Sequence, residues 1–350
     1  MWARVVSQRP GQVAQSMPEP EVQIPLLGSG KNEEKINRQV VTLVIEDMAK
    51  LNDFYNNKDD FKISNTFNED NTATLYNGDC LDFLKTIPDG SFQLIITSPP
   101  YNLGKEYEKK MDIDEYVFQQ TKVIDECVRT LKPRGSICWE IGNFVENGEI
   151  IPLDILLYRC FTKHGLKLRN RIIWHFGHGL HCSKRFSGRY ESIMWFSKNG
   201  DYVFNLDPIR IPQKYPGKKF FRGKRIGEYS CNPLGKNPTD VWDIPNVKSN
   251  HIEKTCHPCQ FPIMLVQRLI LSLSNEGDIV FDPFLGVGST AAAAILNKRK
   301  AAGCELVSKY YDIACDRVTK AYKGELRYRE EKPVYQPDEN LTLAKNPFIN

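Results

Sequence analysis

Strand-length apolar segments alternate with helix-length segments from Thr72 onward, and few folds accommodate such an alternation. Strands are predicted at residues 72–76, 92–97, 136–141, 167–174, 191–196, 278–281 and 301–306. Helices are predicted at residues 111–131, 152–161, 262–273 and 289–298, the first with apolar residues recurring on one face. Because parallel strands need long crossover connections, this order predicts an α/β fold with a mostly parallel sheet covered on both faces.

Composition excludes several other classes of protein. The chain has 350 residues, of which 41% are hydrophobic and 26% charged, as in soluble globular proteins. No segment is long and apolar enough to cross a membrane. Ten scattered cysteines suit free thiols in a reducing compartment, so we expect a cytoplasmic protein.

An unusually rigid turn follows the strand predicted at 92–97. The sequence there reads IITSPPYNLG, so Ser98, Tyr101 and Asn102 surround two consecutive prolines. Proline lacks an N–H group and fixes φ, so the strand must end at this point. A stiff exit from a strand would account for the turn as well as a functional site would.

A second turn follows the strand predicted at 278–281. Residues 278–290 read DIVFDPFLGVGST, and an alanine-rich helix comes next. Gly286 and Gly288 allow the backbone to approach a ligand closely, and Asp282 stands at the carboxyl end of the strand. Glu305 follows about twenty positions later, where an acidic residue suits ribose hydroxyls. The pattern favours a nucleoside cofactor over a plain tight turn, and no Walker lysine is present.

One segment interrupts the alternation with a cluster of cations. Residues 208–227 contain seven basic and no acidic residues, interleaved with aromatic ones: Arg210, Lys214, Lys218, Lys219, Arg222, Lys224 and Arg225. The net charge of the whole chain is only +4, so this patch is local. Such a segment is either a solvated loop or a surface that contacts nucleic-acid phosphates.

The two turns together resemble a known family. Ser98-Pro99-Pro100-Tyr101, followed far downstream by Asp282-Pro283-Phe284-x-Gly286-x-Gly288, resembles the β group of amino-methylating DNA methyltransferases. Further matching elements occur in the same order: Asn77-Gly78-Asp79, Asp240-Val241-Trp242 and His257-Pro258-x-Gln260-x-Pro262. The match covers residues 72–320, and it departs from the common pattern at Phe261, where many members carry lysine.

The resemblance implies a Rossmann-like S-adenosylmethionine-dependent methyltransferase fold, with a seven-stranded sheet and an inserted target-recognition segment. The expected parts are an N-terminal extension at 1–70, a catalytic half at 71–199, the recognition insertion at 200–255, a cofactor-binding half at 256–323 and a tail at 324–350. Within the extension, only Val40–Leu51 predicts a helix.

The resemblance also implies residue roles. Ser98 and the carbonyl of Pro99 would accept hydrogen bonds from the target amine, Pro100 would stiffen the turn, and Tyr101 would stack on the flipped base. The residues implied for S-adenosylmethionine are Asp79, Asp282, Phe284, Gly286, Gly288, Thr290 and Glu305. For Asp79, the cap of a following helix is an alternative role.

No metal is expected, although two motifs have suggestive spacing. Cys256 and Cys259 form a C-x-x-C pair without a second pair, and they lie inside a family element. His175, His178 and His181 recur every third residue beside Cys182, but two glycines disfavour the helix that would align them. A polar loop near DNA is the favoured interpretation.

The implied function is methyl transfer from S-adenosylmethionine to an exocyclic amino group of a base in double-stranded DNA. Serine at position 98 favours cytosine-N4, and adenine-N6 remains the alternative. A catalytically silent DNA-binding module of the same fold is an alternative of another class. The family further suggests a restriction endonuclease acting on the same site, a monomer or homodimer, no membrane partner, and a place at a bacterial-type nucleoid.

Overall fold

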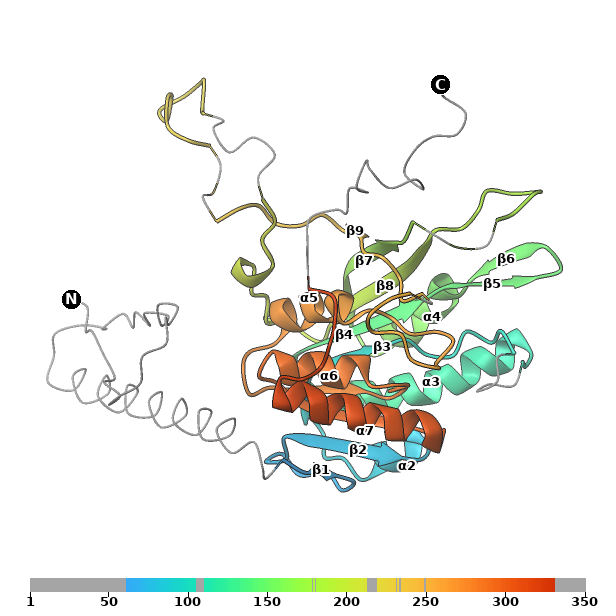
Figure 1. Cartoon of the computed structure of the whole chain (residues 1–350). Coiled ribbons are helices and arrows are strands. Elements are labelled where there is room, and N and C mark those ends of the chain that lie inside the picture. Colours follow the sequence, from blue (N-terminus) through green and yellow to red (C-terminus); the bar gives the residue numbers. More distant parts are fainter. Residues whose placement is uncertain are drawn as a thin grey trace, which may run out of the picture. The chain divides into compact units, whose positions relative to one another are not determined.

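A mixed β-sheet forms the centre of the structure, which is a computed structural model (Figure 1). The strands are β1 (Ile63–Ser64), β2 (Ala73–Asn77), β3 (Phe92–Thr97), β4 (Leu131–Ile141), β7 (Lys167–His175), β8 (Tyr190–Ser197), β9 (Val241–Asp243), β10 (Ile279–Asp282) and β11 (Lys300–Glu305). Their order in the sheet is β1-β2-β11-β10-β3-β4-β8-β7-β9. All seven predicted strands are therefore confirmed.

The structure describes residues 61–330 except 105–109, 178, 180, 213–218, 231, 233 and 249. They belong to one unit, Asp60–Asn350. The helix predicted at Val40–Leu51 lies outside the described residues, as does most of the N-terminal extension.

The sheet has nine strands within the described part of the chain, not the seven expected. The additional strands, β1 and β9, are two and three residues long, which is too short for an alternating pattern in the sequence. Strand β8 runs antiparallel to both β4 and β7, and the other pairings are parallel. A separate hairpin joins β5 (Asn143–Glu146) to β6 (Glu149–Pro152).

Helices cover both faces of the sheet. Helices α5 (Ile263–Leu273), α6 (Ser289–Leu296) and α7 (Ser308–Lys323) share a core with Leu94 and Ile96 of β3 (Figure 1). Helices α2 (Cys80–Lys85), α3 (Ile113–Thr130) and α4 (Leu153–Thr162) share another core with Ile95. This arrangement confirms the predicted covering of both faces.

Helix α7 was not predicted, and α2 was considered only as the helix that Asp79 would cap. Helix α7 has buried residues at four-residue spacing (Tyr310, Ala314, Val318), a pattern that was present in the sequence.

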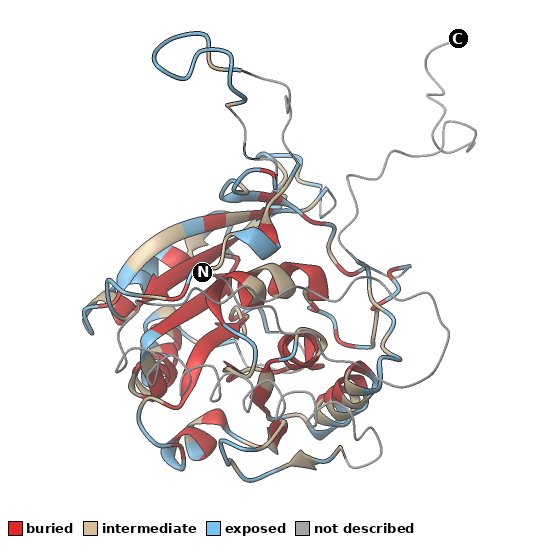
Figure 2. Cartoon of the chain, turned by 90° about the vertical axis from the view of Figure 1, so that its left-hand side faces the viewer, coloured by how far each residue is buried: buried red, intermediate tan, exposed pale blue. Residues whose placement is uncertain are grey.

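Only the short 3-10 helix η1 (Asp207–Ile209) and β9 have regular structure between residues 204 and 253 in the described part. Residues 221–229 there are all exposed, and they form the loop at the upper left of Figure 2.

Candidate active site

Strands β3 and β10 lie side by side and end at the same edge of the sheet. They pair in parallel, with Leu94 opposite Val280 and Ile95 opposite Phe281. The chain leaves β3 towards β4 on one side and leaves β10 towards β11 on the other. Ligands bind at such a reversal of strand order, outside the carboxyl ends of the strands.

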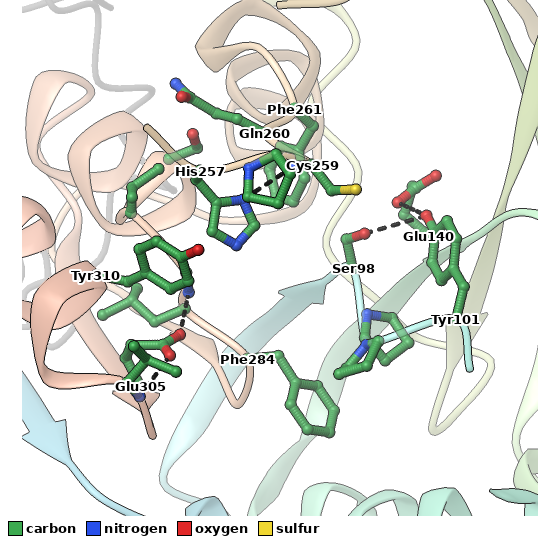
Figure 3. A pocket seen from close by; sticks show the side chains of 18 of the residues that line it. Ser98, Tyr101, Glu140, His257, Cys259, Gln260, Phe261, Phe284, Glu305 and Tyr310 are labelled. Carbon is green, nitrogen blue, oxygen red and sulfur yellow. Dashed lines mark hydrogen bonds between the residues drawn. The ribbon is translucent and has the colours of Figure 1, made fainter. Parts of the chain in front are cut away.

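A cavity of about 420 Å³ opens at this position, within the usual range for small-molecule sites. Both predicted turns line it. Figure 3 shows Ser98, Tyr101 and Glu140 on one side and Glu305 and Tyr310 on the other, with Phe284 between them. The fold therefore brings the two turns, which are far apart in the sequence, to one cavity.

Neighbouring elements hold the proline turn rigid. The Tyr116 hydroxyl of α3 donates to the Pro100 carbonyl at 2.9 Å. The side chain of Asn102, whose φ is 61°, bonds both the N–H (2.7 Å) and the carbonyl (2.8 Å) of Met111. Among the described residues, the Pro99 carbonyl accepts no hydrogen bond.

Two glutamates that the sequence reasoning missed lie behind the proline turn. The Tyr101 hydroxyl donates to Glu140 of β4 and lies 3.1 Å from Ser98 Oγ. Burial raises the pKa of Glu140, while hydrogen bonds with Glu191, Ser98 and Tyr101 lower it. Burial of its carboxyl group and the charge of Glu140 raise the pKa of Glu191 well above its usual value.

The raised pKa values of the two glutamates favour a pair that holds one proton. Two adjacent buried carboxyl groups cannot both stay ionised. Glu140 Oε1 is buried and has no hydrogen-bond partner among the described groups. The raised pKa of Glu191 favours its neutral form, which leaves Glu140 as the carboxylate of the pair that accepts from Tyr101.

Gly142 makes room for the Tyr101 ring. A Cβ atom at Gly142 would lie 2.8 Å from Cε2 and 3.1 Å from Cδ2 of Tyr101. Contacts this short would displace the ring. Gly142 belongs to no recognisable motif, so only the structure identifies its role.

The other side of the cavity is formed by the glycine turn and Glu305. The Glu305 carboxylate accepts hydrogen bonds from the N–H groups of Gly286 and Val307, both at 2.8 Å. Burial raises its pKa, and these donors oppose the shift. Gly286 has a φ of 55°, and a Cβ atom there would point towards His257 Nε2 at 3.7 Å. Because glycine has no side chain, space remains between Gly286 and His257, which both line the cavity.

Asp282 lies beneath the cavity and not in its wall. Its carboxylate accepts hydrogen bonds from Thr97 Oγ1 (2.6 Å), Thr290 Oγ1 (2.7 Å) and the N–H of Phe284 (3.0 Å). Burial raises the pKa of Asp282 to about 6, against the effect of these donors. Asp282, Gly288 and Thr290 are absent from the lining, whereas Asp79, Phe284, Gly286 and Glu305 belong to it. Asp282 instead ties the proline turn to the glycine turn.

Asp79 has the capping role considered for it, and its predicted role in cofactor binding stays a prediction. It caps α2 by accepting a hydrogen bond from the N–H of Leu81 at 2.7 Å, and it also lines the cavity.

A family model described as DNA methylase matches residues 92–316, which is more than half of the chain. The chain belongs to this DNA methylase family. The methylase is 47% identical to the Type II methyltransferase M.BglII of Bacillus subtilis, over 72% of the chain and 70% of that relative. It is 37% identical to the Type II methyltransferase M.ScaI of Streptomyces caespitosus, over 71% of the chain and 82% of that relative.

Solved structures confirm the methyltransferase fold. PvuII DNA methyltransferase superposes with a TM-score of 0.56 at 21% identity, over 71% of this chain and 91% of that one. A DNA modification methylase of Thermus thermophilus, solved with S-adenosyl-L-methionine, has a TM-score of 0.52 at 28% identity, over 71% of this chain and 94% of that one.

The methylase is thus a site-specific DNA methyltransferase that acts on a base amino group and uses S-adenosylmethionine. The cavity fits this cofactor, because it offers a carboxylate, a backbone cradle at Gly286 and the ring of Phe284.

The predicted DNA-contacting cations of the methylase differ in their surroundings. Arg210 is ion-paired with Asp207 at 2.7 Å, and Arg225 with Glu228 at 2.7 Å. Lys219, Arg222 and Lys224 are exposed, whereas Lys214 and Lys218 lie outside the described residues. The Arg210 side chain, which also donates to the Gly235 carbonyl, serves the structure of the insertion.

The histidine and cysteine motifs form no metal cluster in the described part of the methylase. His175 bonds Asp243 at 2.5 Å, and His178 is outside the described residues. Within the same part of the chain, no helix has the length and apolar character to traverse a bilayer.

Proposed function

We propose that the methylase modifies the N4 amino group of cytosine within a specific duplex sequence, after the base has flipped into the cavity. The supporting observation is the Ser98 hydroxyl, which lies in the cavity wall and is joined to Tyr101 and Glu140 behind it. A neutral hydroxyl at this position, where adenine enzymes of the family mostly carry aspartate, favours cytosine.

The chemistry requires acceptors for the amine hydrogens. The lone pair of a base amino group is delocalised into the ring, so the amine becomes nucleophilic only when its hydrogens are held. Ser98 Oγ accepts one hydrogen and the Pro99 carbonyl the other. Because the Tyr101 hydroxyl donates its hydrogen to Glu140, the Ser98 hydroxyl donates to Tyr101, and its lone pairs stay available for the amine before the base arrives. Tyr101 stacks on the base.

The cofactor, when bound, supplies a methyl group activated by a sulfonium. Glu305 accepts the ribose hydroxyls, Asp79 lies at the adenine end, and Phe284 and Gly286 line the site. Asp282, Gly288 and Thr290 act through the shape of the turn, since Thr290 bonds Asp282 and a Cβ atom at Gly288 would lie 2.9 Å from that of Ala314.

Adenine-N6 is the second candidate, because the DNA adenine methyltransferase YhdJ of Escherichia coli K12 is 35% identical over 70% of this chain. The deciding measurement is mass spectrometry of nucleosides from DNA incubated with the methylase and S-adenosylmethionine. We expect N4-methylcytosine. N6-methyladenine alone would overturn the proposed base, and long-read sequencing of the same DNA gives the recognition sequence.

We also propose that residues 200–255 recognise the target, within the five-part division given by the sequence. A restriction endonuclease with the same specificity fits the names of the Type II relatives.

The double variant Lys219→Ala/Lys224→Ala should weaken binding to cognate and random duplexes alike. Both lysines are exposed in the insertion, and the charge of Lys219 lies 5.2 Å from the centre of the Tyr229 ring. Loss of two phosphate contacts should reduce the slope of log affinity against log salt by about 2. The measurement is a salt titration of DNA binding. The control is Lys320→Ala/Lys323→Ala on α7, which removes the same charge and should bind DNA like wild type. Equal DNA binding by the two double variants would contradict phosphate contact by Lys219 and Lys224.

A further inference from the structure

The loop that joins β7 to β8 carries an aromatic side chain almost wholly in solvent. Phe186 is 98% exposed, more than any other large hydrophobic residue in the described part of the chain. A single exposed ring is common on protein surfaces, so this one gains meaning only from its neighbours: two adjacent cations and the active-site cavity at the base of the loop. In Figure 1 this loop extends beyond the ends of both strands.

The loop is held together at its base. The N–H of Phe176 donates to the Arg189 carbonyl at 2.8 Å, which continues the β7–β8 pairing past its last strand pair. Nearer the tip, the N–H of Cys182 donates to Ser187 Oγ at 3.1 Å. These bonds close a short turn that presents Phe186 outward.

Cations accompany the ring. Lys184 and Arg185 directly precede Phe186 and are exposed, and no ion pair of either is recorded among the described residues. An apolar ring beside two uncompensated positive charges suits a partner that offers both phosphates and stacked bases.

The loop begins and ends at the active-site cavity. Trp174 and Phe176 line the cavity before the loop, and Glu191 lines it after the loop. Five residue steps separate Phe186 from Glu191, and such a segment spans at most roughly 18 Å. The tip is therefore within reach of the DNA around a base that occupies the cavity.

We propose that Phe186 is a wedge that enters the DNA base stack and fills the space left by the flipped base, while Lys184 and Arg185 hold the flanking phosphates. The proposal rests on the proposed base flipping. Extrusion of a base loses pairing and stacking, and an inserted aromatic ring restores part of the stacking. Phe186 touches neither the cofactor nor the reacting amine, so it acts as a positioning residue.

The test is single-turnover methylation of two duplexes that carry the recognition sequence, one fully paired and one with the target base mismatched. Phe186→Ala should slow methylation of the paired duplex by about tenfold or more, because base–aromatic stacking is lost. On the mismatched duplex, where flipping is easier, its rate should stay within about twofold of wild type. Phe186→Trp should retain the wild-type rate on both.

Phe118→Ala, which removes another exposed ring (55% exposed) from α3, is the control and should match wild type throughout. An equal loss on both duplexes, or no loss on either, would overturn the wedge while leaving the methylase function intact. Absence of methyl transfer by the wild type to either duplex would instead overturn the proposed function, and the wedge with it.

Discussion

Replacement of Ser98 by alanine is expected to lower kcat for methyl transfer by about 10²–10³, the usual effect of removing one pre-positioned hydrogen-bonding group at a reacting centre. The hydroxyl lies in the cavity wall, 3.1 Å from the Tyr101 hydroxyl, which in turn donates to Glu140. Without it, one amine hydrogen loses its acceptor and the lone pair stays delocalised. Binding of S-adenosylmethionine should change little, because the residues that fit the cofactor lie on the other side of the cavity (Figure 3).

The measurements are single-turnover kinetics for the rate and calorimetry for cofactor affinity. Ser91→Ala is the matched control, because it removes a buried serine hydroxyl that bonds the Pro88 carbonyl at 2.8 Å and precedes the same strand β3. It should reduce stability by about 1 kcal/mol and leave the rate near wild type. A Ser98→Ala rate within a few-fold of wild type would rule out the acceptor role.

Replacement of Asp282 by alanine is expected to lower the free energy of unfolding by about 3 kcal/mol or more and to abolish measurable cofactor binding. Three donors lose their acceptor, namely the hydroxyls of Thr97 and Thr290 and the N–H of Phe284. Each unsatisfied buried group costs about 1–3 kcal/mol. Because these donors belong to both turns, the cavity should lose its shape on both sides.

Denaturant unfolding and calorimetry, run on the same preparations, separate this structural role from direct cofactor contact. Asp79→Ala is the comparison, since it removes an exposed carboxylate that caps α2 and should cost only about 1 kcal/mol in stability. If Asp282→Ala loses cofactor binding but unfolds like wild type, Asp282 contacts the cofactor directly, as the family resemblance alone implied.

Local patterns in the sequence were sufficient for the main elements of the fold. Strand β3 begins and ends where predicted, because its six residues are all buried and two prolines follow closely. The Asn147-Gly148 turn between β5 and β6 also had its signal in the sequence, since both residues adopt positive φ (51° and 86°), as a two-residue hairpin turn requires. That hairpin was missed because its strands are short.

The sequence by itself determined the two turns, their order along the chain and their positions at the carboxyl ends of strands, because prolines, glycines and apolar periodicity act locally. The tertiary structure alone decided what surrounds the turns. Glu140 lies within a strand and Glu191 near the start of another, and nothing local shows that β4 and β8 pair antiparallel so that both carboxyl groups reach Tyr101. The tertiary structure also directs the Asp282 carboxylate away from the cavity, towards the hydroxyls of Thr97 and Thr290. Such roles depend on long-range strand register, and register is fixed by the packing of the whole sheet.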